Sequence, residues 1–219
     1  MTRSGHDSDG PQPDAGSARA RILNAAFDVL RTRGYGATQT REIAARAKVS
    51  KRDIYREFGS KEGIFAALIA ARSGLMRGPA LEPKVASSVD LAETLRQVGI
   101  AFLQQLYDPA VVSVFRMAIA SAEDSPGLAE ILERNGFQPN RRALSELMGA
   151  AVEAGFLTGK TSDLAAQFGA LLTGATHVPI LLGIVPAPKP RERARLSAEA
   201  TAAFLQLHGR AQGGVKVTT

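Results

Sequence analysis

The stretch Thr38–Phe65 reads T-Q-T-R-E-I-A-A-R-A-K-V-S-K-R-D-I-Y-R-E-F-G-S-K-E-G-I-F. Thr40 can cap one short helix, and Ser50, followed three residues later by Asp53, can cap a second. The second helix is short and basic, and its tyrosine is expected to be exposed. Two short helices joined by a tight turn are typical of a helix-turn-helix, whose second helix enters the DNA major groove. The stretch therefore predicts a DNA-recognition unit.

Basic residues are concentrated around this stretch. The residues from Ser17 to Lys61 include eleven Lys and Arg against four Asp and Glu, a net charge of +7, whereas the whole 219-residue chain carries +6. The remainder of the chain is therefore near neutral. A basic segment on a near-neutral body indicates a local contact with a polyanion.

Helical periodicity dominates the rest of the chain, and no sustained period-2 alternation predicts a strand. We therefore expect an all-α fold of about nine helices. Ser17 and Ser60 are further candidate N-caps, Gly34 is a candidate helix end, and Pro109 is a candidate first helical residue. The expected helices cover 17–34, 40–47, 50–58, 60 to before 79, 88–107, 109–122, 126–155 with a break near 135–139, 161–182 and 190–208.

Composition excludes several classes of site. The chain contains no cysteine, which rules out disulfides, thiol redox chemistry and thiolate metal ligands. The three histidines, His6, His177 and His208, are too far apart in the sequence for a zinc motif, so neither a metal nor a cofactor is expected. No G-x-S-x-G, H-E-x-x-H or G-x-G-x-x-G pattern occurs, and the chain is therefore not expected to be an enzyme.

The uncharged stretch 164–188 is long enough for a membrane span. Polar residues such as Gln167 and His177 interrupt it, however, and Pro179 limits the regular helix. A core or subunit-interface helix is therefore expected, with no membrane contact. Because the N-terminus also lacks the apolar core of a signal peptide, a cytoplasmic location is expected.

The order and spacing of three short motifs resemble the TetR family of bacterial transcriptional repressors. The motifs are I-A-x-x-A-x-V-S at Ile43–Ser50, I-Y-R-x-F at Ile54–Phe58 and S-K-E at Ser60–Glu62. This resemblance is specific from Ser17 to about Ala70. More loosely, Phe115–Glu123 and the 161–182 helix resemble the ligand domain of AcrR- and AefR-like members.

The resemblance implies a division of the chain. Residues 17–62 would form the helix-turn-helix DNA-binding domain, and residues 63–210 a helical ligand-binding and dimerisation domain. Residues 1–16, rich in Gly, Pro, Ser and Asp, are expected to be a disordered tail, and 211–219 a flexible one.

The resemblance also implies a set of DNA contacts. Lys51 and Arg52 would face base edges at the start of the recognition helix, and Lys61 would bind phosphate at a helix N-terminus. The full predicted set is Thr40, Arg41, Lys51, Arg52, Tyr55, Arg56 and Lys61.

Two positions depart from the family pattern. Arg52 stands where a small residue is common, and Glu57 stands where His or Tyr is common. Glu57 would repel phosphate unless Arg56 or Arg52 neutralised it. Asp53 either accepts from a cytosine amine or caps its own helix, and capping is favoured because the helix dipole stabilises a carboxylate there.

Candidate pocket and interface residues come from the second domain. The pocket candidates are Phe102, Leu106, Phe115, Arg116, Ile119, Phe137, Phe168 and His177. The alternative for the apolar candidates is plain core packing. The alternative for Arg116 is a buried ion pair with Glu123. Small residues recurring every four positions suggest a subunit interface, with packing inside one chain as the alternative. The interface candidates are Ala166, Ala170, Gly174, Leu196, Ala200, Ala203 and Leu207.

Together these features predict a homodimeric repressor that binds a palindromic operator in double-stranded DNA. An unknown small-molecule effector in the second domain would release it. The alternative is a constitutive DNA-binding or architectural protein whose C-terminal half only dimerises. Loss of operator binding in the presence of a ligand would separate the two.

Overall fold

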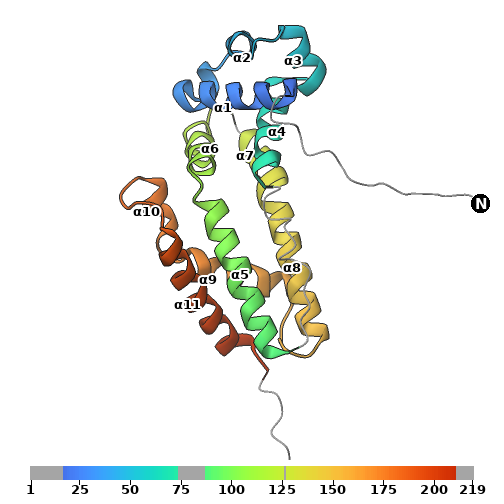
Figure 1. The fold of residues 1–219 in the computed structure, drawn as a ribbon, viewed down its shortest axis with the longest axis vertical. Coiled ribbons are helices and arrows are strands. Elements are labelled where there is room, and N and C mark those ends of the chain that lie inside the picture. Colours follow the sequence, from blue (N-terminus) through green and yellow to red (C-terminus); the bar gives the residue numbers. More distant parts are fainter. Residues whose placement is uncertain (1–16, 74–86, 126, 211–219) are drawn as a thin grey trace, which may run out of the picture. The chain divides into compact units, whose positions relative to one another are not determined.

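The computed structural model describes residues 17–73, 87–125 and 127–210 (Figure 1). These residues form helices and contain no β-strand beyond one isolated bridge between Leu157 and Gly209. The all-α prediction is therefore confirmed. The predicted tails, 1–16 and 211–219, lie outside the described residues, as does the expected end of a helix before Pro79. The chain divides into two compact units, Met1–Leu68 and Ile69–Thr219.

The first unit contains α1 (Ala18–Ala37), α2 (Thr40–Ala47), α3 (Lys51–Phe58) and the start of α4 (Lys61–Ser73). As predicted, the Ser17 hydroxyl accepts from the amide of Ala20 at the start of α1. Gly34 interrupts α1 with a φ of 74°, which glycine adopts without steric cost. The fully buried aliphatic and aromatic side chains that hold the helices together are Ile22, Ala26, Val29, Ile43, Ile54, Ile64 and Phe65.

The caps around the helix-turn-helix largely follow the sequence. Ser50 and Asp53 form a reciprocal capping box, and the Ser60 hydroxyl accepts from the amide of Gly63 in the first turn of α4. The prediction for Thr40 was wrong, because Gln39 occupies the N-cap of α2 without a side-chain bond and Thr40 is the first helical residue.

The second unit contains the remaining helices. They are α5 (Ser88–Leu106), α6 (Pro109–Ala120), α7 (Gly127–Leu132), a π-helical segment η3 (Glu133–Phe137), α8 (Gln138–Glu153), α9 (Thr161–Thr173), α10 (His177–Leu181) and α11 (Pro190–His208). The expected break near 135–139 is this π-helical turn, which joins α7 to α8. The expected 161–182 helix divides in two because Gly174 ends α9 with a positive φ of 49°. These divisions raise the number of helices above the nine that were expected.

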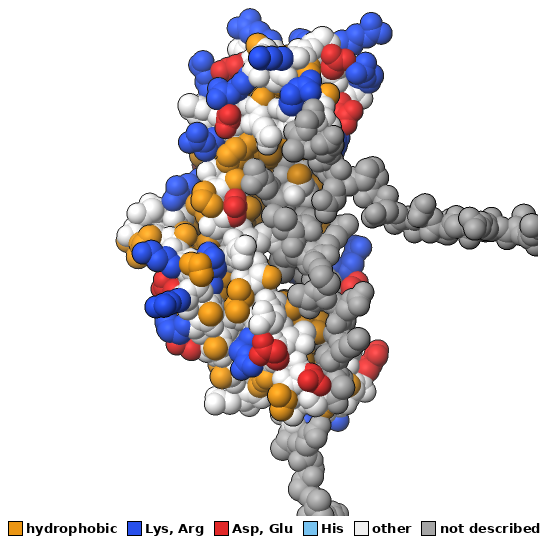
Figure 2. Space-filling view, viewed as in Figure 1, with side chains coloured by type: hydrophobic (Ala, Val, Ile, Leu, Met, Phe, Trp, Pro, Cys, Tyr) orange, Lys and Arg blue, Asp and Glu red, His pale blue; other side chains and the backbone are white. Residues whose placement is uncertain are grey.

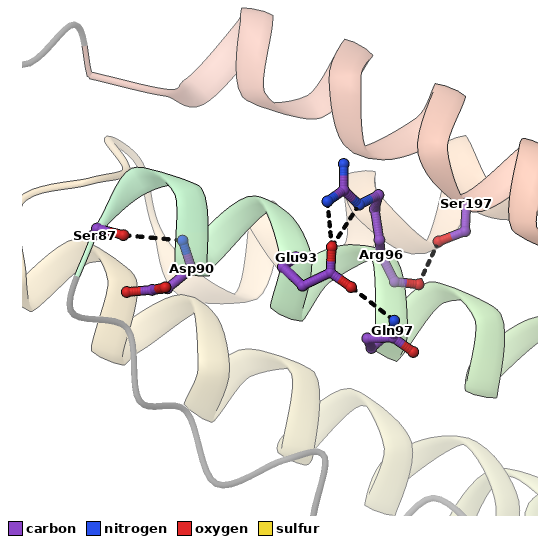
Figure 3. A network of polar contacts seen from close by, with 6 residues as sticks. All are labelled: Ser87, Asp90, Glu93, Arg96, Gln97 and Ser197. Carbon is purple, nitrogen blue, oxygen red and sulfur yellow. Dashed lines mark hydrogen bonds and ion pairs between the residues drawn. The ribbon is translucent and has the colours of Figure 1, made fainter.

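Helices α5 and α11 pack side by side in this unit, and α9 packs against both α8 and α11 (Figure 1). Gly99 allows the close approach of α5 to α11, where the Ser197 hydroxyl donates to the backbone oxygen of Arg96 at 2.7 Å (Figure 3). Phe168 of α9 and Phe204 of α11 meet edge to face, with centroids 5.2 Å apart. The packed helices form the frame around an internal cavity.

The uncharged stretch 164–188 contains α9 and α10 rather than one long helix. Within the described residues, no single helix has the length and apolar character needed to cross a membrane. Helices α5 and α6 reach that length and hydropathy only when taken together, across a bend of 60°.

Candidate nucleic-acid interface and internal cavity

The turn between α2 and α3 depends on one unusual backbone conformation. Lys48 adopts the left-handed region (φ 55°, ψ 49°), and its amide donates to the carbonyls of Ala44 and Ala45. Among the described residues it is the only non-glycine with positive φ, a conformation that costs about 1 kcal/mol or more outside glycine. The tight turn redirects the chain so that α3 starts at Lys51, three residues after Lys48, which caps the end of α2.

Helix α3 presents one polar face to solvent. Ile54 is fully buried and anchors the helix, whereas Lys51, Arg52 and Tyr55 are exposed. The Lys51 ammonium lies 5.5 Å from the centroid of the Tyr55 ring, which holds the two side chains together on the outer face. Figure 2 shows Lys and Arg side chains gathered over the surface that α2 and α3 form. This face is suited to contact with a polyanion.

The carboxylate of Asp53 is engaged within its own helix. It accepts from the Ser50 amide at 3.0 Å and pairs with Arg56 at 2.8 Å. Hydrogen bonding from Ser50 lowers the pKa of Asp53, and the charge of Arg56 acts in the same direction. The capping interpretation of Asp53 is therefore confirmed. Arg56, predicted to contact DNA, is engaged in this ion pair in the free protein.

Glu57 is neutralised by a residue that the sequence did not suggest. Its carboxylate pairs with Arg19 of α1 at 2.7 Å, not with Arg56 or Arg52. The Arg19 guanidinium also lies 5.0 Å from the centroid of the Phe58 ring. The predicted neutralisation was correct in effect and wrong in the partner, because the two residues are 38 positions apart.

Lys61, predicted to bind phosphate, also has a role inside the unit. Its ammonium donates to the carbonyls of Tyr35 at 3.0 Å and Thr38 at 3.4 Å, and lies 4.1 Å from the centroid of the Tyr35 ring. Tyr35 in turn donates to Glu62 at 2.8 Å and packs edge-on against Phe65. We call Tyr35, Lys61, Glu62 and Phe65 the tyrosine clamp, which joins the end of α1 to the start of α4.

Burial and the neighbouring Glu62 carboxylate raise the pKa of Tyr35 well above its ordinary value, so the phenol stays protonated and can donate. The same hydrogen bond lowers the pKa of Glu62. An ammonium has three protons, and the two carbonyls use two of them. The third N–H of Lys61 makes no hydrogen bond to any of the described residues. Sequence reasoning missed Tyr35, since nothing near it in the sequence indicates its partners.

A cavity of about 220 Å³ lies inside the second unit. Five of the eight predicted pocket residues line it, and they are Phe102, Leu106, Phe115, Phe137 and Phe168. Polar lining comes from Gln105, Asn140 and Arg141, which the sequence did not single out. The sequence predicted the aromatic lining residues because apolar residues recur there at helical spacing. The polar lining residues could not be predicted, because their positions in the sequence look like those on any half-exposed helix surface.

The other three predicted pocket residues do not line this cavity. Arg116 donates to the carbonyls of Leu181 at 2.7 Å and Ile180 at 3.0 Å, so it binds the end of α10 and does not pair with Glu123. Ile119 is 61% exposed. The His177 ring packs against Phe115 and Tyr107, with ring centroids 5.6 Å and 5.9 Å apart. Burial lowers the pKa of His177.

The predicted interface residues fall into two groups. Ala200 is 4% exposed and belongs to the core of its own chain, so it is not available to a second subunit. Leu196 and Ala203 are half-buried, with Leu196 packed on that core. The exposed members are Ala166, Ala170, Gly174 and Leu207. Ala166 also borders the cavity.

Comparison with known proteins places both units. Residues 93–210, more than half of the chain, match the C-terminal domain of AefR-like transcriptional repressors, and residues 22–68 match the bacterial regulatory proteins of the tetR family. The chain belongs to the TetR family. TetR-family proteins are DNA-binding transcriptional regulators and not enzymes, and the residues that match the family's DNA-binding part, 22–68, include α3.

Individual relatives of this TetR-family chain match in part or at low identity. The uncharacterized HTH-type transcriptional regulator YvkB of Bacillus subtilis (strain 168) is 41% identical over 86 residues, which cover 39% of this chain and 43% of the relative. This chain therefore spans less than half the length of that relative.

Two solved structures match nearly the whole chain. A TetR transcriptional regulator from Agrobacterium tumefaciens superposes with a TM-score of 0.76 at 26% identity, covering 90% of this chain and 97% of the other. The flavonoid-responsive regulator FrrA gives 0.73 at 27% identity, covering 90% and 100%.

Proposed function

We propose that this chain is a homodimeric repressor that binds a palindromic operator and is released by a small molecule held in the cavity of the second unit. The observation that carries the proposal is the combination of an exposed recognition face on α3 with a mostly apolar cavity in the other unit. Family membership supports the DNA contact, and the response of FrrA to flavonoids supports a small-molecule effector. Such a repressor would act in the cytoplasm, where its operator lies.

The contacts to DNA divide by position. Lys51 and Arg52 on the outer face of α3 would reach base edges, and Tyr55 would contact a backbone phosphate or a thymine methyl group. At the start of α2, Thr40 would touch phosphate and Arg41 would reach a base. Arg56 would contribute only by leaving Asp53, and Lys61 only through its remaining N–H.

Release requires that the effector bind one conformation more tightly than another. Helix α4 contains both Lys61 of the tyrosine clamp and Ile69, which borders the cavity. An effector that displaces Ile69 would therefore act on the helix that the clamp joins to α1. The exposed residues Ala166, Ala170 and Leu207 are the proposed contacts between subunits.

The proposal is tested with DNA sequences selected by the purified protein from a random pool. A palindromic consensus with two half-sites is expected, and binding should weaken steeply with salt because phosphate contacts release counterions. Arg52→Ala should relax preference at one position of each half-site by roughly 1–3 kcal/mol. Arg191→Ala, an exposed arginine of α11, is the matched control and should change nothing.

A uniform loss of affinity for Arg52→Ala, with the same base preferences, would assign that side chain to phosphate. Operator binding that no cavity ligand weakens would favour the constitutive architectural protein instead.

A further inference from the structure

The walls of the cavity are built from aromatic rings on separate elements. Phe102 comes from α5, Phe115 from α6, Phe137 from η3 and Phe168 from α9. Phe115 and Phe137 meet edge to face at 5.5 Å between centroids, and Phe168 is fixed in the same way against Phe204. Rings held at fixed angles around an apolar space favour a further aromatic ring, which can stack or meet them edge-on.

The size of the cavity limits the ring system. An apolar cavity of about 150 Å³ lined by Leu, Ile and Phe accepts benzene. The cavity in this chain, at about 220 Å³, is roughly one and a half times as large. It therefore has room for two fused rings.

The charge around the cavity does not favour an acid. Among the described residues that line it, Arg141 is the only charged one. Its guanidinium is already paired with the Glu133 carboxylate of η3. A carboxylate ligand would have to displace Glu133 or be buried unpaired, which is costly, and the phosphates of a coenzyme A ester would need several unpaired cations.

The polar lining lies towards one end of the cavity. Figure 1 shows α5 and α8 running in opposite directions, so Gln105 near the end of α5 and Asn140 in the first turn of α8 belong to the same end. Phe137, 36% exposed, and the exposed Arg141 belong to this end as well. Two amides supply both donors and acceptors, which suit a hydroxyl or carbonyl.

We infer that the cavity binds a neutral bicyclic aromatic molecule that carries a hydroxyl or carbonyl group. The fused rings lie among the four phenylalanines, and the oxygen faces Gln105 and Asn140. The inference rests on the proposed function for its role as effector, but the chemistry of the cavity carries it.

The probe is 2-naphthol, which is neutral at neutral pH, compared with 2-naphthoate, which has the same rings and a negative charge. The chain contains no tryptophan, so naphthol fluorescence can be followed without tryptophan emission. Saturable binding of 2-naphthol is expected, with 2-naphthoate about tenfold weaker or more. Tighter binding of 2-naphthoate, or displacement of 2-naphthol by a long-chain acyl-coenzyme A, would overturn the inference.

Gly169→Leu locates the binding. Gly169 lines the cavity, and a Cβ there would meet no atom within 4 Å, so the new side chain has space to enter. Affinity for 2-naphthol should fall by about tenfold or more because the leucine occupies the space of the ligand. Ala101→Leu, at an exposed position of α5 outside the lining, is the control and should keep full affinity. Unchanged binding by folded Gly169→Leu would place the ligand elsewhere.

A second variant covers the case in which Gly169→Leu does not fold. Arg141→Gln should keep the affinity for 2-naphthol within about twofold, since a neutral ligand does not need the charge. A loss of about tenfold would show that the charge is used and would contradict a neutral ligand.

Operator release is measured separately from binding. Saturable 2-naphthol binding without operator release would refute the proposed function and leave the ligand class standing. Operator release by acids or acyl-coenzyme A esters alone would do the reverse.

Discussion

Replacement of Gly99 by alanine tests the close packing of α5 against α11. A Cβ at this position would lie 2.3 Å from the Ser197 hydroxyl oxygen and 2.8 Å from a methyl group of Leu172. Ser197 is fully buried, and its hydroxyl donates to the carbonyl of Arg96 (Figure 3). The serine cannot move away without weakening that bond, so the helices would have to separate.

The expected cost has three parts. Overpacking costs roughly 1–3 kcal/mol, and loss of the Ser197 hydrogen bond costs about 0.5–1.5 kcal/mol. Alanine is favoured over glycine in a helix by about 0.8–1.0 kcal/mol, which offsets part of this. We expect Gly99→Ala to lower the free energy of unfolding by roughly 1–3 kcal/mol.

The assay is urea unfolding followed by circular dichroism at a fixed protomer concentration, because dimerisation would make the midpoint depend on concentration. Gly149→Ala in α8 is the matched control, since its Cβ would make only an ordinary contact with Thr161 at 3.8 Å. That variant should gain up to about 1 kcal/mol. Ser197→Gly, added to Gly99→Ala, should recover part of the loss. If Gly99→Ala proved as stable as Gly149→Ala, the inferred close approach would be incorrect.

Three further perturbations test the clamp and the interface. Lys61→Met should lower the free energy of unfolding by roughly 1–3 kcal/mol, because it removes two charged hydrogen bonds and a ring contact. If the remaining N–H reaches phosphate, the slope of log DNA affinity against log salt concentration should also fall by about one unit in this variant. Unchanged stability would contradict the tyrosine clamp. Tyr35→Phe removes the hydrogen bond that lowers the pKa of Glu62, so the variant should be less stable than wild type above pH 4.5, the ordinary pKa of a glutamate. This difference in the free energy of unfolding should disappear as the pH falls through the lower pKa that Glu62 has in the folded protein. Denaturant titrations at several pH values measure the difference, and a difference that persists in acid would contradict the prediction. Leu207→Glu, at a position 68% exposed, should yield monomers in sedimentation with helical content kept. It is a cleaner test than a change at Gly174, whose φ of 49° strains any side chain. A variant that remains dimeric would show that Leu207 does not lie in the subunit interface.

Features that depend on neighbours within a turn or two could be predicted from the sequence. Ser17, Ser50 and Pro109 start helices where their side chains predicted, and Gly34 interrupts α1. These outcomes follow from hydrogen bonds and dihedral preferences that involve residues at most four apart. The motif order around Ser50 is equally local, and for that reason it was sufficient to predict the helix-turn-helix and the family.

Which distant groups meet depends on how the helices pack, and the sequence did not predict it. Glu57 is paired with Arg19 at a separation of 38 residues, Lys61 binds the carbonyl of Tyr35 at 26, and Arg116 binds that of Leu181 at 65. A charged side chain selects its partner from whatever packing brings near, and several candidates in the sequence carry the same charge or the same carbonyl. The same reason explains why the lining of the cavity was predicted only in part. Phe115 and Ile119 lie on one helix, and the helical period made them equal candidates for the lining. Packing against η3 put the first into the wall and left the second exposed.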